Sequence, residues 1–172
     1  MELPKFKYSP NAYTLPIFEE EEGVCSACNE NRNLRYNCSF YSIEEPEYIC
    51  PWCIENGKAA EIFEGEFNDY EGIENSKNIS KELLLAVSER TPSYPSWQQE
   101  VWLTHCNQPC AFIGFADYNT IEPFMAELQD DINNLGIDRE FILRNLSTDG
   151  RVVGYLFQCL NCKQHRLHVD SD

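Results

Sequence analysis

The stretch Cys25-Ser-Ala-Cys28, followed after 21 residues by Cys50-Pro-Trp-Cys53, predicts a metal-binding module near the start of the chain. Each pair places two thiolates on a tight turn, and a hairpin between the pairs would bring the two turns together. Four sulfurs at about 2.3 Å from one ion complete a closed tetrahedron, which is typical of structural zinc. We therefore expect Cys25, Cys28, Cys50 and Cys53 to bind one Zn²⁺.

A second set of cysteines predicts another site of the same kind. Cys106 and Cys110 are separated by three residues, and Cys159-Leu-Asn-Cys162 follows 48 residues later. These four cysteines are the default ligands of a second Zn²⁺, because this spacing also lies within the range of zinc ligands. The alternative is a site of three cysteines and one histidine, in which His105 replaces Cys106.

Zinc is preferred over two other uses of paired cysteines. The N-terminal residues Met1–Lys7 contain no apolar signal segment, so we expect a cytoplasmic protein whose reduced thiols bind metal rather than form disulfides. Cys50-Pro-Trp-Cys53 also has the spacing of a redox dithiol, but a redox enzyme has no need for the Cys25–Cys28 pair. The ninth cysteine, Cys38, stands alone in the pattern and is expected to fill apolar space.

The charge of the chain limits what it can bind. There are 29 acidic and 13 basic residues among 172, which gives a formal net charge of −16. Such a surface repels phosphate backbones, so nucleic acid is disfavoured as a partner. No stretch approaches the roughly 20 apolar residues that cross a membrane. The acidity either keeps the protein soluble or provides a face that meets a basic protein at enhanced rates.

The chain is predicted to be an α+β protein with three segments. Residues 1–22 form an extended N-terminal segment that ends in the acidic run Glu19–Glu22. Residues 23–90 form a zinc-ribbon-like module with an acidic segment and a helix capped by Ser80. Residues 91–172 form a second zinc-clipped α+β module with a C-terminal β-hairpin.

Apolar periodicity predicts two helices in the second module, at Trp97–Leu103 and across Asn119–Leu146. A strand is expected on either side of the last cysteine pair, and together these strands form the hairpin. We expect His165 and His168 to be exposed residues of its second strand rather than metal ligands.

One acidic segment is a candidate partner-binding surface. Glu64, Glu66, Asp69 and Glu71 fall in a stretch without basic residues, and aromatic residues are interleaved with them. Such a stretch forms either a ligand for a basic groove or a solvated acidic loop. A second acidic region, residues 118–131, is the other candidate.

The sequence contains none of the short motifs that mark common active sites. It has no His-Glu-x-x-His, no phosphate-binding glycine loop and no Gly-x-Ser-x-Gly, and His105-Cys-Asn lacks the His-x-Glu of zinc deaminases. We therefore expect no catalytic residues and no enzymatic activity. The alternatives are a zinc hydrolase at the second site, which needs an open position on the ion, and a thiol redox enzyme.

Several stretches resemble a known family. They are Val24-Cys-Ser-Ala-Cys28, Cys50-Pro-Trp-Cys-Ile-Glu-Asn-Gly-Lys-Ala-Ala60, Trp97-Gln-Gln-Glu100, Trp102-Leu-Thr-His-Cys-Asn-Gln-Pro-Cys110 and Gly154-Tyr-Leu-Phe-Gln-Cys-Leu-Asn-Cys162. In these stretches, which span nearly the whole chain, the protein is similar to the CbrC family of small bacterial proteins. The chain departs from that family mainly after Gly114 and at its C-terminal end. The resemblance implies a zinc-binding fold without known catalytic activity. Because the family is associated by name with colicin tolerance, it also implies a role in surviving a bacteriocin.

Charge and resemblance together give the functional hypothesis. Nuclease toxins are commonly basic because they bind phosphate backbones, so an inhibitor gains from an acidic face. We expect an immunity or tolerance protein that binds and neutralises a basic toxin domain. The alternative is a zinc-bearing adaptor or regulator in a stress response.

Overall fold

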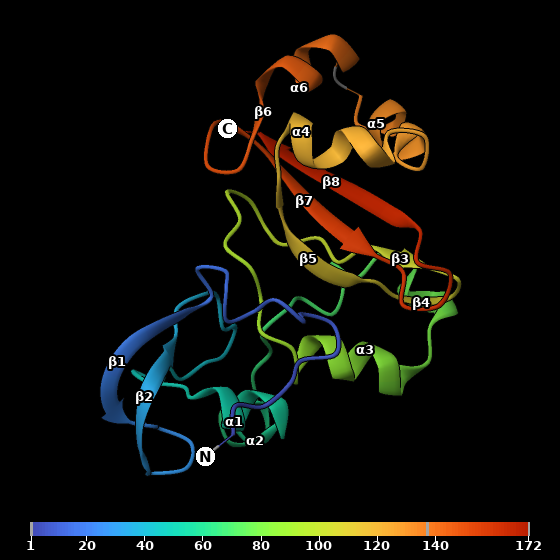
Figure 1. The fold of residues 1–172 in the computed structure, drawn as a ribbon. Helices are drawn as coiled ribbons and strands as arrows, with labels where there is room; N and C mark the ends of the chain where they lie inside the picture. The colour runs from blue at the N-terminus through green and yellow to red at the C-terminus, as the bar shows by residue number, and fades with distance from the viewer. Residues whose placement is uncertain (1, 137, 172) are drawn as a thin grey trace.

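The computed structural model describes residues 2–136 and 138–171 and has the expected α+β fold, with small sheets (Figure 1). In chain order the elements are β1 (Phe18–Val24), β2 (Asn31–Tyr36), α1 (Pro51–Glu55), α2 (Lys58–Phe63), η1 (Ser76–Asn78), α3 (Lys81–Ser88), β3 (Thr104–His105), β4 (Gln108–Pro109), β5 (Ala111–Ala116), α4 (Tyr118–Ile121), η2 (Glu122–Phe124), α5 (Gln129–Asn134), α6 (Arg139–Asn145), β6 (Leu146–Ser147), β7 (Val152–Gln158) and β8 (His165–Ser171). In Figure 1 the β1–β2 hairpin with α1 and α2 forms the lower part, and β5, β7 and β8 with α4, α5 and α6 form the upper part. Among the described residues, no helix is both long and apolar enough to cross a membrane.

The N-terminal segment ends in strand β1. Phe6 is buried in irregular chain, and Ile17 is buried at the end of the turns that precede the strand. The acidic run Glu19–Glu22 is exposed, as expected, but it belongs to β1 rather than to irregular chain. It is held there because β1 pairs antiparallel with β2, for example at Glu19 and Arg35.

Strand β7 is the centre of the larger sheet. It pairs antiparallel with β5 and β8, and β6 pairs in parallel with its first residues. Because successive side chains of a strand point to opposite faces, Val153, Tyr155 and Phe157 enter the larger core, whereas Val152 and Leu156 pack with the helices. The β7–β8 pair is the expected C-terminal hairpin, and the last cysteine pair lies in its connection.

The helix expected at Trp97–Leu103 is absent, and this prediction was wrong. The N–H of Gln98 donates to the carboxylate of Asp170 (2.9 Å), and the N–H of Trp102 donates to the carbonyl of Gly72 (3.2 Å). A backbone N–H bonded to a distant partner cannot close a helical bond to the carbonyl four residues before it. Tertiary contacts therefore override the helical periodicity here.

The region Asn119–Leu146 is helical, but in the short pieces α4, η2, α5 and α6. Pro123 lies in η2 and has no N–H for a continuous helical ladder. Gly136, at φ +69°, follows α5 in the left-handed region and stops it. The side chain of Asp138 then caps α6 by accepting from the N–H of Phe141 (2.8 Å).

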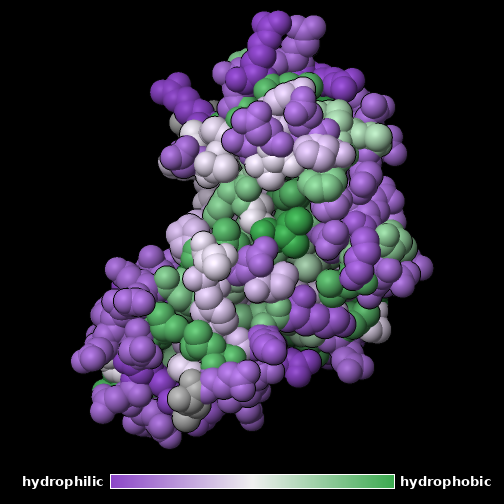
Figure 2. All heavy atoms as spheres, viewed as in Figure 1, coloured by the Kyte–Doolittle hydropathy of each residue, from purple (hydrophilic) through white to green (hydrophobic). Residues whose placement is uncertain are grey.

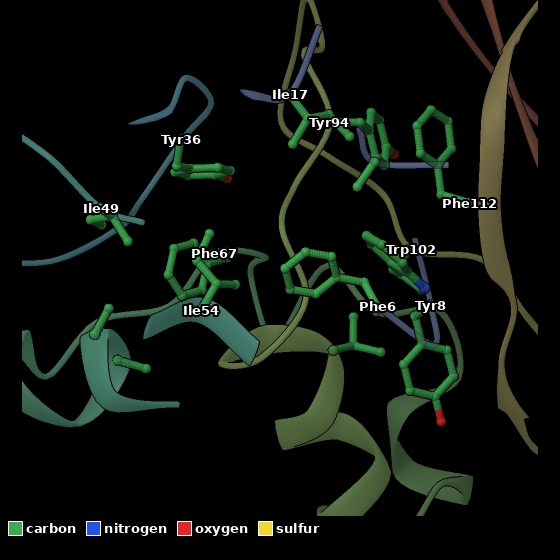
Figure 3. Packing of buried hydrophobic residues seen from close by; sticks show 14 of the residues in the cluster. Phe6, Tyr8, Ile17, Tyr36, Ile49, Ile54, Phe67, Tyr94, Trp102 and Phe112 are labelled. Carbon is green, nitrogen blue, oxygen red and sulfur yellow. The ribbon is translucent and has the colours of Figure 1, made fainter. Parts of the chain in front are cut away.

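One large apolar cluster runs through all three expected segments. Phe6 and Tyr8 of the first segment pack in the same cluster as Phe67 of the second and Trp102 of the third. Figure 3 shows these side chains together around the segment of chain that links the lower and upper parts of the molecule. The boundaries at residues 22/23 and 90/91 therefore do not divide the core, and Tyr94, just after the second boundary, is fully buried. A second cluster joins α4, α5 and α6 to the sheet.

Candidate metal centres

The first four cysteines come together as predicted. One sulfur from each of Cys25, Cys28, Cys50 and Cys53 lies within 4.8 Å of the others. The Sγ atoms of Cys28 and Cys50 are 4.0 Å apart. Three of the four cysteines are buried and Cys28 is half-buried.

Two local turns position these sulfurs. After β1, the N–H of Cys25 donates to the carbonyl of Glu30 (3.0 Å) and the N–H of Asn29 donates to the carbonyl of Cys25 (2.8 Å). Asn29 closes this knuckle in the left-handed region at φ +59°. Cys50 caps α1, Pro51 takes its first position, and the N–H of Cys53 donates to the carbonyl of Cys50 (3.1 Å). The site thus clips the end of a hairpin to the start of a helix.

Arg32 gives the first cluster a positive neighbour that sequence reasoning missed. Its side chain hydrogen-bonds the thiols of Cys50 and Cys28. Its guanidinium lies 4.6 Å from the ring centroid of Trp52, one of the two residues between Cys50 and Cys53. A cation at this place offsets part of the negative charge that four thiolates carry around a divalent ion. Arg32 lies in β2, between the two pairs, and its position in the sequence gave no signal of this contact.

The thiols of this cluster compete for protons. Hydrogen bonds with Cys50 and Cys53 hold the pKa of Cys25 far below its usual range. The hydrogen bond with Cys25 in turn raises the pKa of Cys50 to about 11, and the hydrogen bonds with Cys25 and Cys50 raise that of Cys53 as well. The Cys25 thiolate therefore forms readily, whereas a cation among the sulfurs would favour ionisation of Cys50 and Cys53.

The second cluster differs from the four-cysteine set that the sequence predicts. It consists of His105, Cys106, Cys159 and Cys162, whose ligand atoms also lie within 4.8 Å of one another. His105 Nδ1 is 3.2 Å from the sulfur of Cys106 and 3.3 Å from that of Cys162. The sulfurs of Cys106 and Cys162 are 3.8 Å apart. The expected ligand Cys110 is not in this cluster.

Cys110 is left out for a structural reason. It precedes β5, is fully buried, and belongs to the large apolar cluster. Burial raises the pKa of its thiol to about 12, which favours the neutral form. The structure therefore brings together three cysteines and one histidine, with His105 in the place expected of Cys110 rather than of Cys106.

The second cluster is built from two turns that face each other. Cys106 and Asn107, at φ +52° and +57°, form the two-residue connection of the β3–β4 hairpin. In the β7–β8 connection, the N–H of Cys159 donates to the carbonyl of Gln164 (2.8 Å) and the N–H of Lys163 donates to that of Cys159 (3.0 Å). Lys163 has φ +66°. This second knuckle repeats the bonding of the knuckle at Cys25.

The separations between the donor atoms fit a tetrahedral ion. With metal–sulfur bonds of about 2.3 Å, the sulfur–sulfur edges of a tetrahedron are about 3.8 Å, and with metal–nitrogen bonds of about 2.0 Å the nitrogen–sulfur edges are about 3.5 Å. The sulfurs of Cys28 and Cys50 are 4.0 Å apart and those of Cys106 and Cys162 are 3.8 Å apart, and all ligand atoms of each cluster lie within 4.8 Å of one another. The nitrogen–sulfur separations of 3.2 and 3.3 Å are slightly shorter. Both donor sets therefore suit one metal ion each.

Comparison with known proteins places the chain in a family. The uncharacterised protein family UPF0167 matches residues 3–171. The chain belongs to this family. A UPF0167 protein of Pseudomonas aeruginosa is 34% identical over 176 residues, which cover 99% of this chain and 97% of the relative. UPF0167 proteins of Mycobacterium bovis and Mycobacterium tuberculosis are each 33% identical over 183 residues, which cover 98% of this chain and 93% of each relative. No solved structure matches the chain.

The candidate acidic surface of this UPF0167 protein is only partly open. Glu64, which ends α2, and Glu71 are exposed. Glu66 is half-buried and accepts from the N–H of Tyr70 (3.2 Å). Asp69 accepts from the N–H of Glu71 (2.9 Å) and from the side-chain amide of Gln99. The segment is therefore folded onto the protein, and two of its four carboxylates already serve internal bonds.

The histidines of β8 are not exposed, so that expectation was wrong. His165 is 8% exposed, its ring stacks on Phe124 at 3.7 Å, and its Nδ1 lies 3.0 Å from the Glu127 carboxylate. His168 is half-buried beside Tyr155, and burial lowers its pKa. Both faces of the sheet are covered, so each side of β8 meets other parts of the fold.

Arg166 lies beside the second cluster and carries the most extensive ion-pair network found among the described residues. Its guanidinium bonds Glu74 (3.0 and 3.1 Å) and Asp131 (2.9 Å), and it donates to the carbonyl of Thr104. Burial alone would raise the pKa of Glu74, but hydrogen bonds from Arg166 and Thr104 hold it below its usual value. The network ties β8 to α5 and to the residue before His105. Glu74 lies 92 positions before Arg166 and Asp131 lies 35 positions before it, so no local sequence pattern could reveal this network.

Proposed function

We propose that this UPF0167 chain is a non-enzymatic protein in which two structural Zn²⁺ ions hold a partner-binding fold together. The observation that carries this proposal is the convergence of two four-ligand sets at tetrahedral spacing, each formed by two separate turns. Soft thiolate ligands with imidazole in tetrahedral geometry favour zinc among the divalent metals. Four protein ligands fill the coordination sphere of zinc, whereas catalytic zinc keeps a position for water.

The role of each ion follows from what it joins. The first would clip the β1–β2 hairpin to α1, and the second would clip the β3–β4 turn to the β7–β8 connection. These are short elements: α1 has five residues, and β3 and β4 have two each. Elements of this size are marginal by themselves, so metal clips supply stability that local structure lacks.

Metal analysis of ligand variants tests the assignment of the second site. We expect about two zinc equivalents in purified wild-type protein, and between three and four sulfur ligands per zinc by X-ray absorption. His105→Ala should lose the second zinc, since only three cysteines remain around it. Cys110→Ala, the matched control, should keep both ions.

Loss of the second zinc in Cys110→Ala but not in His105→Ala would restore Cys110 as a ligand. A folded, metal-free protein with disulfides within the cysteine pairs would contradict zinc altogether.

We also propose that the partner is a basic protein, such as a toxin domain that this chain neutralises. The net charge of −16 and the exposed carboxylates of β1, Glu64 and Glu71 support a basic partner. The resemblance to the CbrC family spans nearly the whole chain, as does the UPF0167 match. We propose that the two names cover one group of proteins, and the association of CbrC with colicin tolerance supports a toxin as partner.

Association kinetics test this partner proposal. The zinc-loaded protein is used to capture its partner from the cells that express it, and the rate constants are then measured across salt concentrations. We expect fast association at low salt, with a steep fall as the screening length shortens to about 8 Å at physiological ionic strength. Glu64→Gln with Glu71→Gln should slow association at low salt by on the order of 10-fold and leave dissociation nearly unchanged.

A matched pair of changes locates the face that steers association. Glu122→Gln with Asp130→Asn removes the same charge from the second acidic region, where both residues are exposed. Slower association in this pair alone would move the contact to residues 118–131.

Association that does not depend on salt concentration would contradict a basic partner. Unchanged toxin sensitivity in a deletion strain would contradict immunity, and capture of a multi-protein complex would favour an adaptor.

A further inference from the structure

The two metal centres differ in how far solvent reaches them. In the first cluster Cys25, Cys50 and Cys53 are buried, and the half-buried Cys28 contacts the Arg32 side chain. In the second cluster Cys106 and Cys162 are exposed, His105 is half-buried, and only Cys159 is buried. A pocket of about 330 Å³, lined by His105, Cys106, Asn107 and Arg166 among others, opens directly beside it. Small solutes can therefore reach the sulfurs of Cys106 and Cys162 in the second cluster, but not most of the sulfurs in the first.

The geometry selects one pair of sulfurs within the second cluster. Those of Cys106 and Cys162 are 3.8 Å apart, both are exposed, and each lies at the tip of its own turn. Cys159 is buried, with its sulfur 3.9 Å from the carbonyl of His105. A disulfide needs sulfurs about 2.05 Å apart, and exposed side chains on turns can rotate through the remaining distance. Cys106 and Cys162 can therefore join without displacing the strands behind them.

We propose that Cys106 and Cys162 form a peroxide-sensitive pair, and that their oxidation to a disulfide releases the second zinc ion while the first stays bound. This inference rests on the proposed zinc function. The first oxidised cysteine and its resolving partner are adjacent in the same site, as in other reversible thiol sensors.

The chemistry balances with hydrogen peroxide as the oxidant. One thiolate sulfur attacks a peroxide oxygen, the O–O bond breaks, and a sulfenic acid and one hydroxide form. The second thiolate then attacks the sulfenic sulfur, the S–O bond breaks, and a disulfide and a second hydroxide form. Two electrons pass from the two sulfurs to one peroxide. His105 and Cys159 are the ligands that remain, and two ligands do not hold Zn²⁺ tightly.

The disulfide would replace the metal as the link between the two turns. Cys106 lies in the β3–β4 connection and Cys162 in the β7–β8 connection, so the new bond joins the same elements. The fold would then persist after zinc leaves, and a thiol reductant with added Zn²⁺ would restore the original site. His105, no longer a ligand, would be free at the edge of the adjacent pocket.

Zinc release under hydrogen peroxide tests this inference on the full chain. We expect wild-type protein that carries two zinc equivalents to release about one of them to a chromophoric chelator, with first-site zinc retained. Peptide mapping by mass spectrometry should find a Cys106–Cys162 disulfide in the same fraction of molecules. Cys106→His, which keeps a metal-binding group but removes one thiol, should retain its zinc at peroxide concentrations that empty the wild-type site. Cys38→Ala, which removes a thiol outside both clusters, should behave as wild type.

Each failure has a distinct meaning. A protein that carries fewer than two zinc equivalents before peroxide is added contradicts the proposed function. A protein that starts with two and releases both together, or releases neither while Cys106 is oxidised, overturns this inference alone. A disulfide that contains Cys110 or Cys159 instead of the exposed pair would also overturn it.

Discussion

Cys50→Ser is expected to empty the first metal site and to unfold the chain around it. Cys50 is fully buried, caps α1, and its sulfur lies 4.0 Å from that of Cys28, so serine leaves an incomplete tetrahedron. Structural zinc contributes about 10–16 kcal/mol to the folding of small zinc peptides, and a whole domain is stable by only about 5–15 kcal/mol. We therefore expect the loss of one zinc equivalent and a fall of more than about 5 kcal/mol in the free energy of unfolding.

Denaturant unfolding, zinc analysis and amide exchange measure this effect. Exchange should become fast in β1, β2 and α1, the elements that the first site clips together. Cys38→Ser is the matched control, because Cys38 is half-buried and lies outside both clusters. It should keep both zinc ions and lose no more than about 2 kcal/mol. Wild-type stability in Cys50→Ser would show that the first cluster does not hold the fold through a metal.

Arg166→Ala is expected to have the second-largest effect. It leaves Glu74 and Asp131 without their cation, and the side chains of Arg166 and Asp131 are only 17% and 11% exposed. Removal of one partner from a buried ion pair costs about 3–5 kcal/mol, because the remaining charge is uncompensated. The guanidinium also donates to Thr104, next to His105, so zinc at the second site should bind more weakly while the first site is unaffected.

Two comparisons separate the charge from the packing. Arg144→Ala removes an exposed pair with Glu140 and should cost only about 0.3–0.5 kcal/mol. The triple change Arg166→Met, Glu74→Gln and Asp131→Asn removes all three charges, so it should recover much of the lost stability. Denaturant unfolding and zinc analysis measure both. A loss in Arg166→Ala no larger than that in Arg144→Ala would mean that solvent, rather than the network, compensates these carboxylates.

Local patterns predicted the parts of the structure that depend on neighbouring residues. The hairpin around Cys159 and Cys162 and the helix that begins after Ser80 lie where local patterns placed them, although the Ser80 side chain makes no capping hydrogen bond. Periodicity failed at Trp97–Leu103, where the backbone N–H groups find partners in Asp170 and Gly72. It also placed His165 on a free surface, because it could not show that α5 and the residues before it cover that face of β8.

Local sequence sufficed to predict two cysteine-rich clusters that could each hold a metal ion, because a Cys-x-x-Cys pair carries its geometry in one turn. The knuckles at Cys25 and Cys159 have the same backbone bonds and the same left-handed closing residue, Asn29 in one and Lys163 in the other. Which side chains meet in the second cluster depends instead on contacts between distant parts of the chain. Cys110 is fully buried in the apolar core, whereas the β3–β4 turn carries Cys106 and His105 to the knuckle of a hairpin more than 50 residues away. The choice between His105 and Cys110 depends on which of them faces that knuckle, and this is set by long-range packing rather than by spacing along the chain.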